Sequence, residues 1–263
     1  MATTSIRTRY LAAAISTALA AGGLHAATIT VDSADDDVAS EYCNLRFALQ
    51  AINGGSTANV PTCSSAVSGS AFGTNDTVEF TYYLTGASIT LSQGSLPLTA
   101  TSLTISGSGQ SIDAAGNGSV LAVGENVTVA ASQLYLKGGA SAEHGGGVTI
   151  GMGGHVELTE CAVSFNSAAA KGGGLYLAPG ATLSLIRSTI SGNSAATGAA
   201  IFAKSGATVT VTDSLIEGNY ASYSAGAIYS SGSALTLDTA TISKNTAPYY
   251  SGGVVAFFDT IAI

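Results

Sequence analysis

Charged residues, proline, cysteine and tryptophan are all scarce in this chain of 263 residues. Only 9% of the residues are charged, and there are 4 prolines, 3 cysteines and no tryptophan. Disordered chains combine low hydrophobicity with high charge, whereas this chain is 46% hydrophobic, so we expect an ordered fold. The cysteines include no Cys-x-x-Cys pair, so the metal-site spacing built on that pair is missing.

Basic residues are few and never form a run. Lysine and arginine total 8 against 16 acidic residues, which gives a formal net charge of −8. Binding of nucleic acid requires clustered cations that displace the counterions of the phosphates. We therefore expect no nucleic-acid partner.

The first 26 residues have the pattern of a secretory signal peptide. Arg7 and Arg9 precede an apolar run over 11–21, which is followed by small residues. The alternative is an N-terminal membrane anchor, but the run falls short of the ~20 residues that a membrane span requires. We expect cleavage near Ala26 and export to an extracellular or outer-membrane surface location.

A repeat of 26 to 27 residues is the most informative property of the remaining chain. Four segments align without gaps, and each carries an asparagine at the same place, with spacings of 27, 26 and 26 residues: 156–168, 183–195, 209–221 and 235–247, with Asn166, Asn193, Asn219 and Asn245. Apolar residues alternate with polar ones within each copy, which is the period of a strand with one buried face. Repeats of this length stack on their neighbours to bury an apolar face that a single copy leaves open.

Glycine, of which there are 33 residues, marks a second recurring element. A glycine box and a short apolar run follow each asparagine by about nine residues, as in GGGLYL at 172–177 and GAAIFA at 198–203. Glycine permits left-handed or closely packed corners that a Cβ atom would obstruct. The pattern predicts an all-β, single-stranded, right-handed parallel β-helix, irregular from residue 77 and regular from about residue 127 to 263.

Residues 27–76 are expected to form an N-terminal strand, a capping helix and a cysteine loop. Leu45, Ala48, Leu49 and Ile52 fall at helical spacing within 40–53, with Ser40 or Asp37 as the expected N-cap. Such a helix would cover the open N-terminal end of the coil and its unpaired strand edge.

Two motifs resemble a known group of secreted bacterial proteins. The segment CNLRFALQAIN at 43–53 resembles the Cys-Ser-Leu-Arg-Glu-Ala motif, with Asn44 in place of Ser and Phe47 in place of Glu. The repeats are similar to polymorphic outer membrane protein repeats, whose Gly-Gly-Ala-aliphatic box survives approximately and whose Phe-x-x-Asn box keeps the asparagine. The resemblance covers about residues 28–260. It implies a parallel β-helix displayed at the cell surface or secreted, as in adhesins and autotransporter passengers.

The asparagines are expected to form a structural ladder rather than a row of ligand-binding groups, because asparagine tolerates the left-handed conformation and stacked copies can bond to each other. Cys43 and Cys63 flank the predicted helix, and in an oxidising compartment they would form a disulfide. Cys161 shares its repeat position with Ser188 and Ser214, which indicates a small packed residue.

Tyrosines near the glycine boxes are the candidates for a binding surface: Tyr176, Tyr220, Tyr223 and Tyr229. An exposed tyrosine stripe on a solenoid would contact a glycan or a protein partner. The alternative is that Tyr176 and Tyr229 are merely outward strand residues. His144 and His155 lie beside glycine runs, where we expect solvated loop histidines, and we expect no metal or other cofactor.

Surface binding or display is our first functional hypothesis. The alternative is a carbohydrate-active enzyme, a polysaccharide lyase or glycoside hydrolase, on the same fold; a purely structural passenger is a third. Such enzymes need neighbouring carboxylates. The repeats place Glu160 and Asp213 in adjacent columns with other residues between them, and the acidic run Asp35 to Asp37 is expected to be an exposed turn, so we expect no catalytic residues.

The final residues, VVAFFDTIAI, include no polar capping segment. A bare last coil invites association between edges. We expect a truncated product or a fragment, whose missing C-terminal region would provide any association with the outer membrane.

Overall fold

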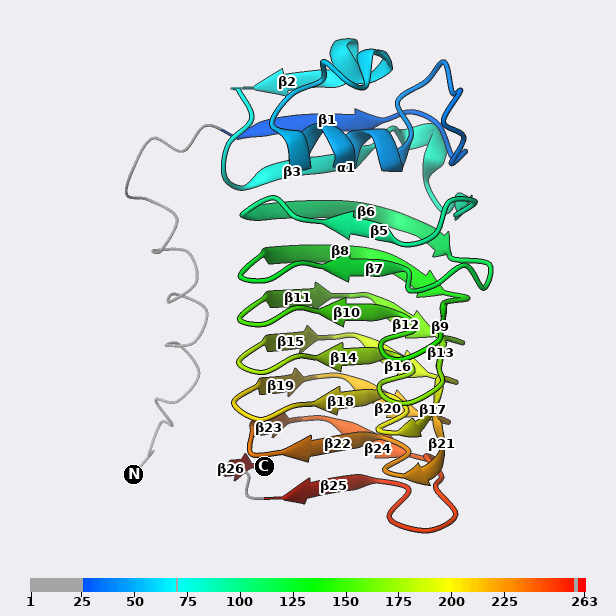
Figure 1. The fold of residues 1–263 in the computed structure, drawn as a ribbon, viewed down its shortest axis with the longest axis vertical. Helices are drawn as coiled ribbons and strands as arrows, with labels where there is room; N and C mark the ends of the chain where they lie inside the picture. Colours follow the sequence, from blue (N-terminus) through cyan, green and yellow to red (C-terminus); the bar gives the residue numbers. More distant parts are fainter. Residues whose placement is uncertain (1–25, 70, 258–259) are drawn as a thin grey trace, which may run out of the picture.

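The protein is an elongated stack of parallel β coils. The computed structural model describes residues 26–69, 71–257 and 260–263, and Figure 1 shows the coils from the N-terminal end at the top to the C-terminal end at the bottom. The predicted signal peptide lies outside the described residues except for Ala26. The structure confirms the predicted β-helix with a short N-terminal helix.

Three sheets run along the stack. The first sheet follows the order β2-β1-β3-β6-β8-β11-β15-β19-β23-β26, with β4, β12, β16, β20 and β24 forming a second arm beyond a bend; the bounds are β1 Ala27–Val31, β2 Val67–Gly69, β3 Asp76–Phe80, β4 Ser88–Thr90, β6 Ser102–Asp113, β8 Thr128–Lys137, β11 His155–Thr159, β12 Ala162–Ser164, β15 Thr182–Ile186, β16 Thr189–Ser191, β19 Thr208–Thr212, β20 Leu215–Glu217, β23 Ala234–Asp238, β24 Thr241–Ser243 and β26 Thr260–Ala262. Apart from β2, which pairs antiparallel with β1, neighbours are parallel.

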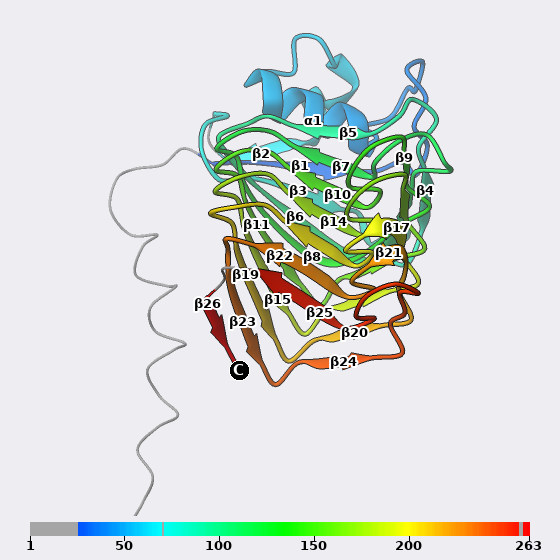
Figure 2. The same ribbon diagram turned by 60° about the horizontal axis from the view of Figure 1, so that its bottom comes forward.

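The other two sheets close each coil, as Figure 2 shows from another side. The second sheet has the order β25-β22-β18-β14-β10-β7-β5, with bounds β5 Leu96–Leu98, β7 Leu121–Val123, β10 Val148–Ile150, β14 Leu175–Leu177, β18 Ile201–Ala203, β22 Ile228–Ser231 and β25 Val254–Phe257. The third sheet has the order β21-β17-β13-β9, with bounds β9 Ala140–Ser141, β13 Ser167–Ala168, β17 Ser194–Thr197 and β21 Tyr220–Ser224.

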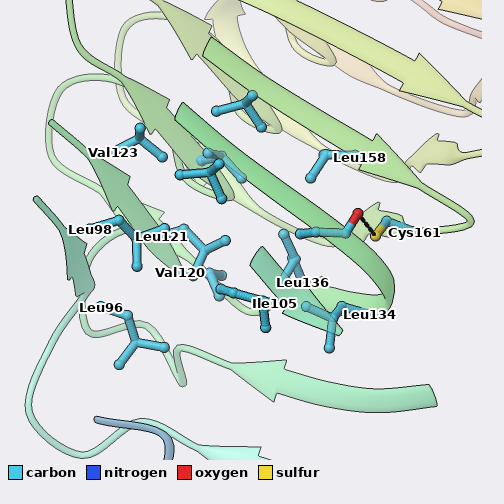
Figure 3. Close-up of a cluster of buried hydrophobic side chains, with 14 of the residues drawn as sticks. Leu96, Leu98, Ile105, Val120, Leu121, Val123, Leu134, Leu136, Leu158 and Cys161 are labelled. Atoms are coloured by element: carbon cyan, nitrogen blue, oxygen red, sulfur yellow. Dashed lines mark hydrogen bonds between the residues drawn. The ribbon is translucent and has the colours of Figure 1, made fainter. Parts of the chain in front are cut away.

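The core consists of apolar side chains that stack in columns between the sheets. One column takes one residue from each coil, and all of its members are at most 1% exposed: Val129, Val156, Leu183, Val209 and Leu235. Figure 3 shows the same arrangement in the earlier coils, where Leu136 and Leu158 lie among residues of the second sheet. Each buried aliphatic side chain contributes roughly 1.5–3 kcal/mol, so the interior stabilises a coil only when its neighbours cover it.

The four repeat asparagines form a continuous column at one corner of the coil. Asn166, Asn193 and Asn219 are at most 1% exposed. In each step the Oδ1 atom accepts from the backbone N–H of the preceding asparagine, and Nδ2 donates to a carbonyl of the preceding coil. Our expectation that asparagine itself takes the left-handed conformation was wrong, because the residue before it has the positive φ, as at Phe165 and Gly192.

The helix α1 (Leu45–Gly54) begins later than the sequence predicted. Asn44 is the N-cap, and its side chain accepts from the backbone N–H of Phe47 at 2.9 Å. Ser40 and Asp37 do not cap the helix because their side chains are used within the preceding loop, where Ser40 bonds Asp35 and Asp37 accepts from the Ala39 amide. The chain between β1 and Asn44 therefore stays a loop.

Helix α1 covers the free edge of the second sheet at β5. Asn53 donates to the Pro97 carbonyl at 2.8 Å and accepts from the Thr99 amide at 2.8 Å. Arg46 donates to the Ser95 carbonyl at 3.1 Å. These side chains satisfy backbone groups that would otherwise offer a template for pairing with another chain.

Cys43 and Cys63 are joined by a disulfide, which ties the start of α1 to the 3-10 helix η1 (Pro61–Ala66). Both cysteines are fully buried. A second short 3-10 helix, η2 (Tyr82–Leu84), follows β3. No helix within the described ranges is both long and apolar enough to cross a membrane.

Candidate ligand-binding groove

An aromatic column runs along the outer face of the second sheet. Tyr176 on β14, Phe202 on β18 and Tyr229 on β22 are paired in register. The ring centroids of Tyr176 and Phe202 are 5.9 Å apart and nearly parallel at 11°, and those of Phe202 and Tyr229 are 4.9 Å apart at 2°. The rings therefore cover each other's faces.

This stacking changes the expected exposed tyrosine stripe. Tyr176 and Phe202 are only 8% and 5% exposed, because neighbouring rings lie on both sides of each. Their edges, rather than their faces, point toward solvent. Most of the column is structural, and ring faces for a ligand must come from residues beside it.

Two adjoining hollows lie against the column and together form a groove. The first has a volume of about 280 Å³ and is lined by Lys171, Thr197, Phe202, Tyr223, Ser224, Tyr229, Tyr250 and Phe257. The second has a volume of about 320 Å³ and is lined by Lys171, Pro179, Phe202, Ala203, Lys204, Ser205, Tyr229 and Ser231. Because the two share Lys171, Phe202 and Tyr229, we treat them as one site and call it the aromatic groove.

A β-bulge places Tyr223 on the wall of this groove. In the pairing of β17 with β21, Ala195 faces Ala221 but Thr197 faces Ser224, so β21 holds one extra residue between these points. Ser222 and Tyr223 are both exposed as a result. Bulges commonly re-aim a side chain next to a functional site.

Tyr223 contacts a second exposed tyrosine across the mouth of the groove. Its hydroxyl oxygen lies 3.5 Å from that of Tyr250, and the two rings meet edge to face with centroids 5.2 Å apart. The hydrogen bond with Tyr250 raises the pKa of the Tyr223 phenol above its usual value. Both hydroxyls stay protonated near neutral pH and are available to a ligand.

The predicted binding tyrosines divide between these places. Tyr223 and Tyr229 line the aromatic groove, and Tyr176 stacks beneath it. Tyr220 lies on β21 with Tyr223 and is equally exposed, at 52% against 51%, but it does not line the groove. Sequence reasoning missed Phe202, Lys171 and Lys204, although all three stand at or beside the glycine boxes.

The histidines differ from their expected setting as solvated loop residues. His144 stacks on Tyr176 with centroids 4.5 Å apart, and its buried Nδ1 atom has no hydrogen-bond partner. It lines a separate hollow of about 410 to 470 Å³ class size only at the far end of the column, together with Glu143 and Thr149, whose volume is about 470 Å³. His155 is the first residue of β11 and therefore lies on a strand, because its neighbours alternate in and out of the core.

The acidic residues are engaged by neighbouring groups. Glu160 and Asp213 occupy one column rather than adjacent ones, with Arg187 between them, because all three are the left-handed residues of the same bend. Arg187 donates to Glu160 at 2.9 Å, and hydrogen bonds from Gln133 and Arg187 lower the pKa of the Glu160 carboxyl. Over the part of the chain that the structure describes, no three His, Cys, Asp or Glu side chains gather into a group that would hold a metal ion.

The run Asp35 to Asp37 is not simply an exposed turn. Asp36 is only 5% exposed and forms a salt bridge with Arg46 at 2.7 Å. Asp35 accepts hydrogen bonds from Ser33 and Asn44. Burial alone would raise the pKa of Asp35, but these hydrogen bonds outweigh it and lower the pKa. The run organises the loop before α1.

Comparison with known proteins gives one match. A family model described as a right-handed beta helix region matches residues 85–254. These residues include the aromatic groove and all four asparagines of the ladder. No curated protein and no solved structure matches the chain.

Proposed function

The chain belongs to the right-handed β-helix family, and on this premise we propose that it is an exported binding module of bacterial origin, displayed at the cell surface or secreted in the manner of an adhesin or autotransporter passenger. The aromatic groove is its ligand site. Export is supported by the signal-like segment 1–26, and surface display by the resemblance of the 43–53 motif and of the repeats.

The observation that carries the proposal is the position of Tyr223 and Tyr250. Both rings are more than half exposed and meet over a hollow of about 280 Å³ whose floor is the edges of Phe202 and Tyr229. Tyrosine provides apolar ring surface and a hydroxyl group at low conformational cost, which suits recognition of glycans and proteins alike. Nothing in the packing of the core requires these two rings to lie there.

The test is a glycan array screened with the mature chain and with single alanine variants. Tyr223→Ala and Tyr250→Ala should weaken binding about tenfold, because exposed tyrosines at the centre of a site carry much of the affinity. Tyr220→Ala is the matched control, since it removes an equally exposed tyrosine from the same strand outside the groove. Loss of binding in the Tyr220 variant alone would refute the proposed site.

A reducing-sugar assay on every glycan that binds separates this proposal from the alternative of a carbohydrate-active enzyme. We expect binding without release of reducing ends or of unsaturated products. Catalytic turnover that Tyr223→Ala abolishes would replace the binding module by an enzyme acting at the same groove.

A further inference from the structure

Two lysines stand apart from the other cations of the chain. Six lysine and arginine residues lie in the described ranges, and four of them form salt bridges: Arg46, Lys137, Arg187 and Lys244. Lys171 and Lys204 form none with any described residue. In a chain whose net charge is −8, cations without a carboxylate partner are unusual.

Both of these lysines lie over the aromatic column. The Nζ atom of Lys171 is 4.7 Å from the ring centroid of Phe202, and that of Lys204 is 5.7 Å from the centroid of Tyr176. Attraction to the ring faces holds each ammonium group in place without neutralising its charge. The groove therefore keeps two charges available for a ligand.

The lining of the groove has one sign of charge. Lys171 and Lys204 both line the hollow of about 320 Å³, and no aspartate or glutamate lines either hollow of the groove. Hydroxyl groups of Ser205 and Ser231 accompany them. An anionic ligand would meet two cations and several hydrogen-bonding groups without a repelling carboxylate in the lining.

The backbone around the groove favours a glycan over a peptide. Extended peptides usually bind by adding a strand to a free sheet edge. β14, β18 and β22, which form the floor, are each paired on both sides, so they offer no free edge. A ligand at this place is recognised through side chains alone, by charge, hydroxyl groups and ring surface.

We propose that the aromatic groove binds an acidic polysaccharide, with Lys171 and Lys204 pairing with its carboxylate or sulfate groups and Tyr223 and Tyr250 contacting its sugar rings. This inference rests on the proposed function and specifies its ligand class. Carboxylate and sulfate share the chemistry that a lysine recognises, so separate probes distinguish them.

The experiment compares two double variants of the mature chain by binding to immobilised polygalacturonate, dextran sulfate, uncharged dextran and polyglutamate. Lys171→Gln with Lys204→Gln removes the two free charges, while Lys137→Gln with Lys244→Gln removes the same charge from salt bridges elsewhere. Thermal melting verifies that each variant is folded. A third variant, Lys171→Arg with Lys204→Arg, keeps the charge and should keep binding.

We expect the wild type to bind polygalacturonate or dextran sulfate, and the groove variant to bind it about tenfold more weakly, as the loss of two exposed ionic contacts implies. The control variant should stay within about twofold, and 0.5 M salt should weaken wild-type binding by screening. Preference for polyglutamate, or equal losses in the two glutamine variants, would overturn the inference. Equal binding of uncharged dextran would also overturn it but leave the proposed function standing, whereas binding to no glycan on the array would defeat both.

Discussion

The Oδ1 atom of Asn219 accepts two hydrogen bonds from Asn193, one from its backbone N–H at 2.9 Å and one from its Nδ2 at 3.0 Å. The same Asn219 donates from Nδ2 to the carbonyl of Ile190 at 3.0 Å. Both asparagines are buried, so these bonds have no water to replace them. The column thus connects neighbouring coils at a corner where the backbone cannot form regular strand pairing.

Replacement of Asn219 by leucine should destabilise the fold strongly. The substitution leaves buried donors of Asn193 and the Ile190 carbonyl unpaired, which costs about 3 kcal/mol or more and lowers the melting temperature by roughly 10 °C. Circular dichroism during heating measures the change, with Asn59→Leu, at an exposed position, as the control. A melt unchanged from wild type, with ligand binding lost, would instead make the column a binding site.

Phe202 and Tyr223 should separate stability from binding. Phe202→Ala removes a ring that is 95% covered by its neighbours in the column, and we expect a loss of about 3–5 kcal/mol in the free energy of unfolding. Tyr223→Ala removes a half-exposed ring and should change it by no more than about 0.5 kcal/mol. Denaturant titration measures both, and the reverse order would show that the bulge supports the fold.

The disulfide should stabilise the N-terminal cap. Its cysteines are 20 residues apart, and replacing both by serine should cost about 2–4 kcal/mol. The measurement is denaturant unfolding of the variant beside wild type with and without reductant. Wild type should shift toward the variant when it is reduced, and an unchanged unfolding midpoint would contradict the prediction.

The buried ion pair before α1 should be more sensitive than an exposed one. In Arg46→Met the carboxylate of Asp36, whose side chain is 2% exposed, loses its partner, which should cost about 3–5 kcal/mol. The matched control is Arg187→Met, which breaks the exposed pair with Glu160 and should cost up to about 1 kcal/mol. Equal effects of the two variants on the unfolding midpoint would show that Asp36 is hydrated.

Cys161 should resist thiol reagents in the folded protein. Burial raises the pKa of its thiol to about 11 from 9.0, so thiolate is scarce at pH 8. Because the folded state favours the neutral thiol, this stabilising contribution is complete below pH 9 and is lost as the pH rises through about 11. Labelling at pH 8 should require denaturant, and rapid labelling of the native chain would contradict the buried setting.

Periodicity made the architecture predictable from the sequence. The spacing of Asn193, Asn219 and Asn245 equals one turn of the coil, so like residues had to stack once the strands were parallel. The alternation around Val209 and Val211 identified the buried face in the same way. These features repeat, and repetition is what a single sequence displays most clearly.

The groove was less predictable because it depends on what breaks the repeat. The asparagine spacing hides the extra residue in β21, which lies between Asn219 and the next glycine box and becomes visible only when β17 and β21 are paired. Likewise, alternation marks Tyr176 as pointing outward, but only the coil on each side shows that its ring is covered. The start of α1 at Asn44 was missed because three nearby residues can also cap a helix.

The bulge at Tyr223 has a consequence for how such a protein changes over time. The coils before and after it keep their strand pairing, with Tyr220 facing Ser194 and Ile228 facing Ile201. An insertion at this corner is therefore absorbed within a single turn and leaves the register of the stack intact. Ligand preference can evolve one turn at a time here, on a scaffold that has no need to readjust.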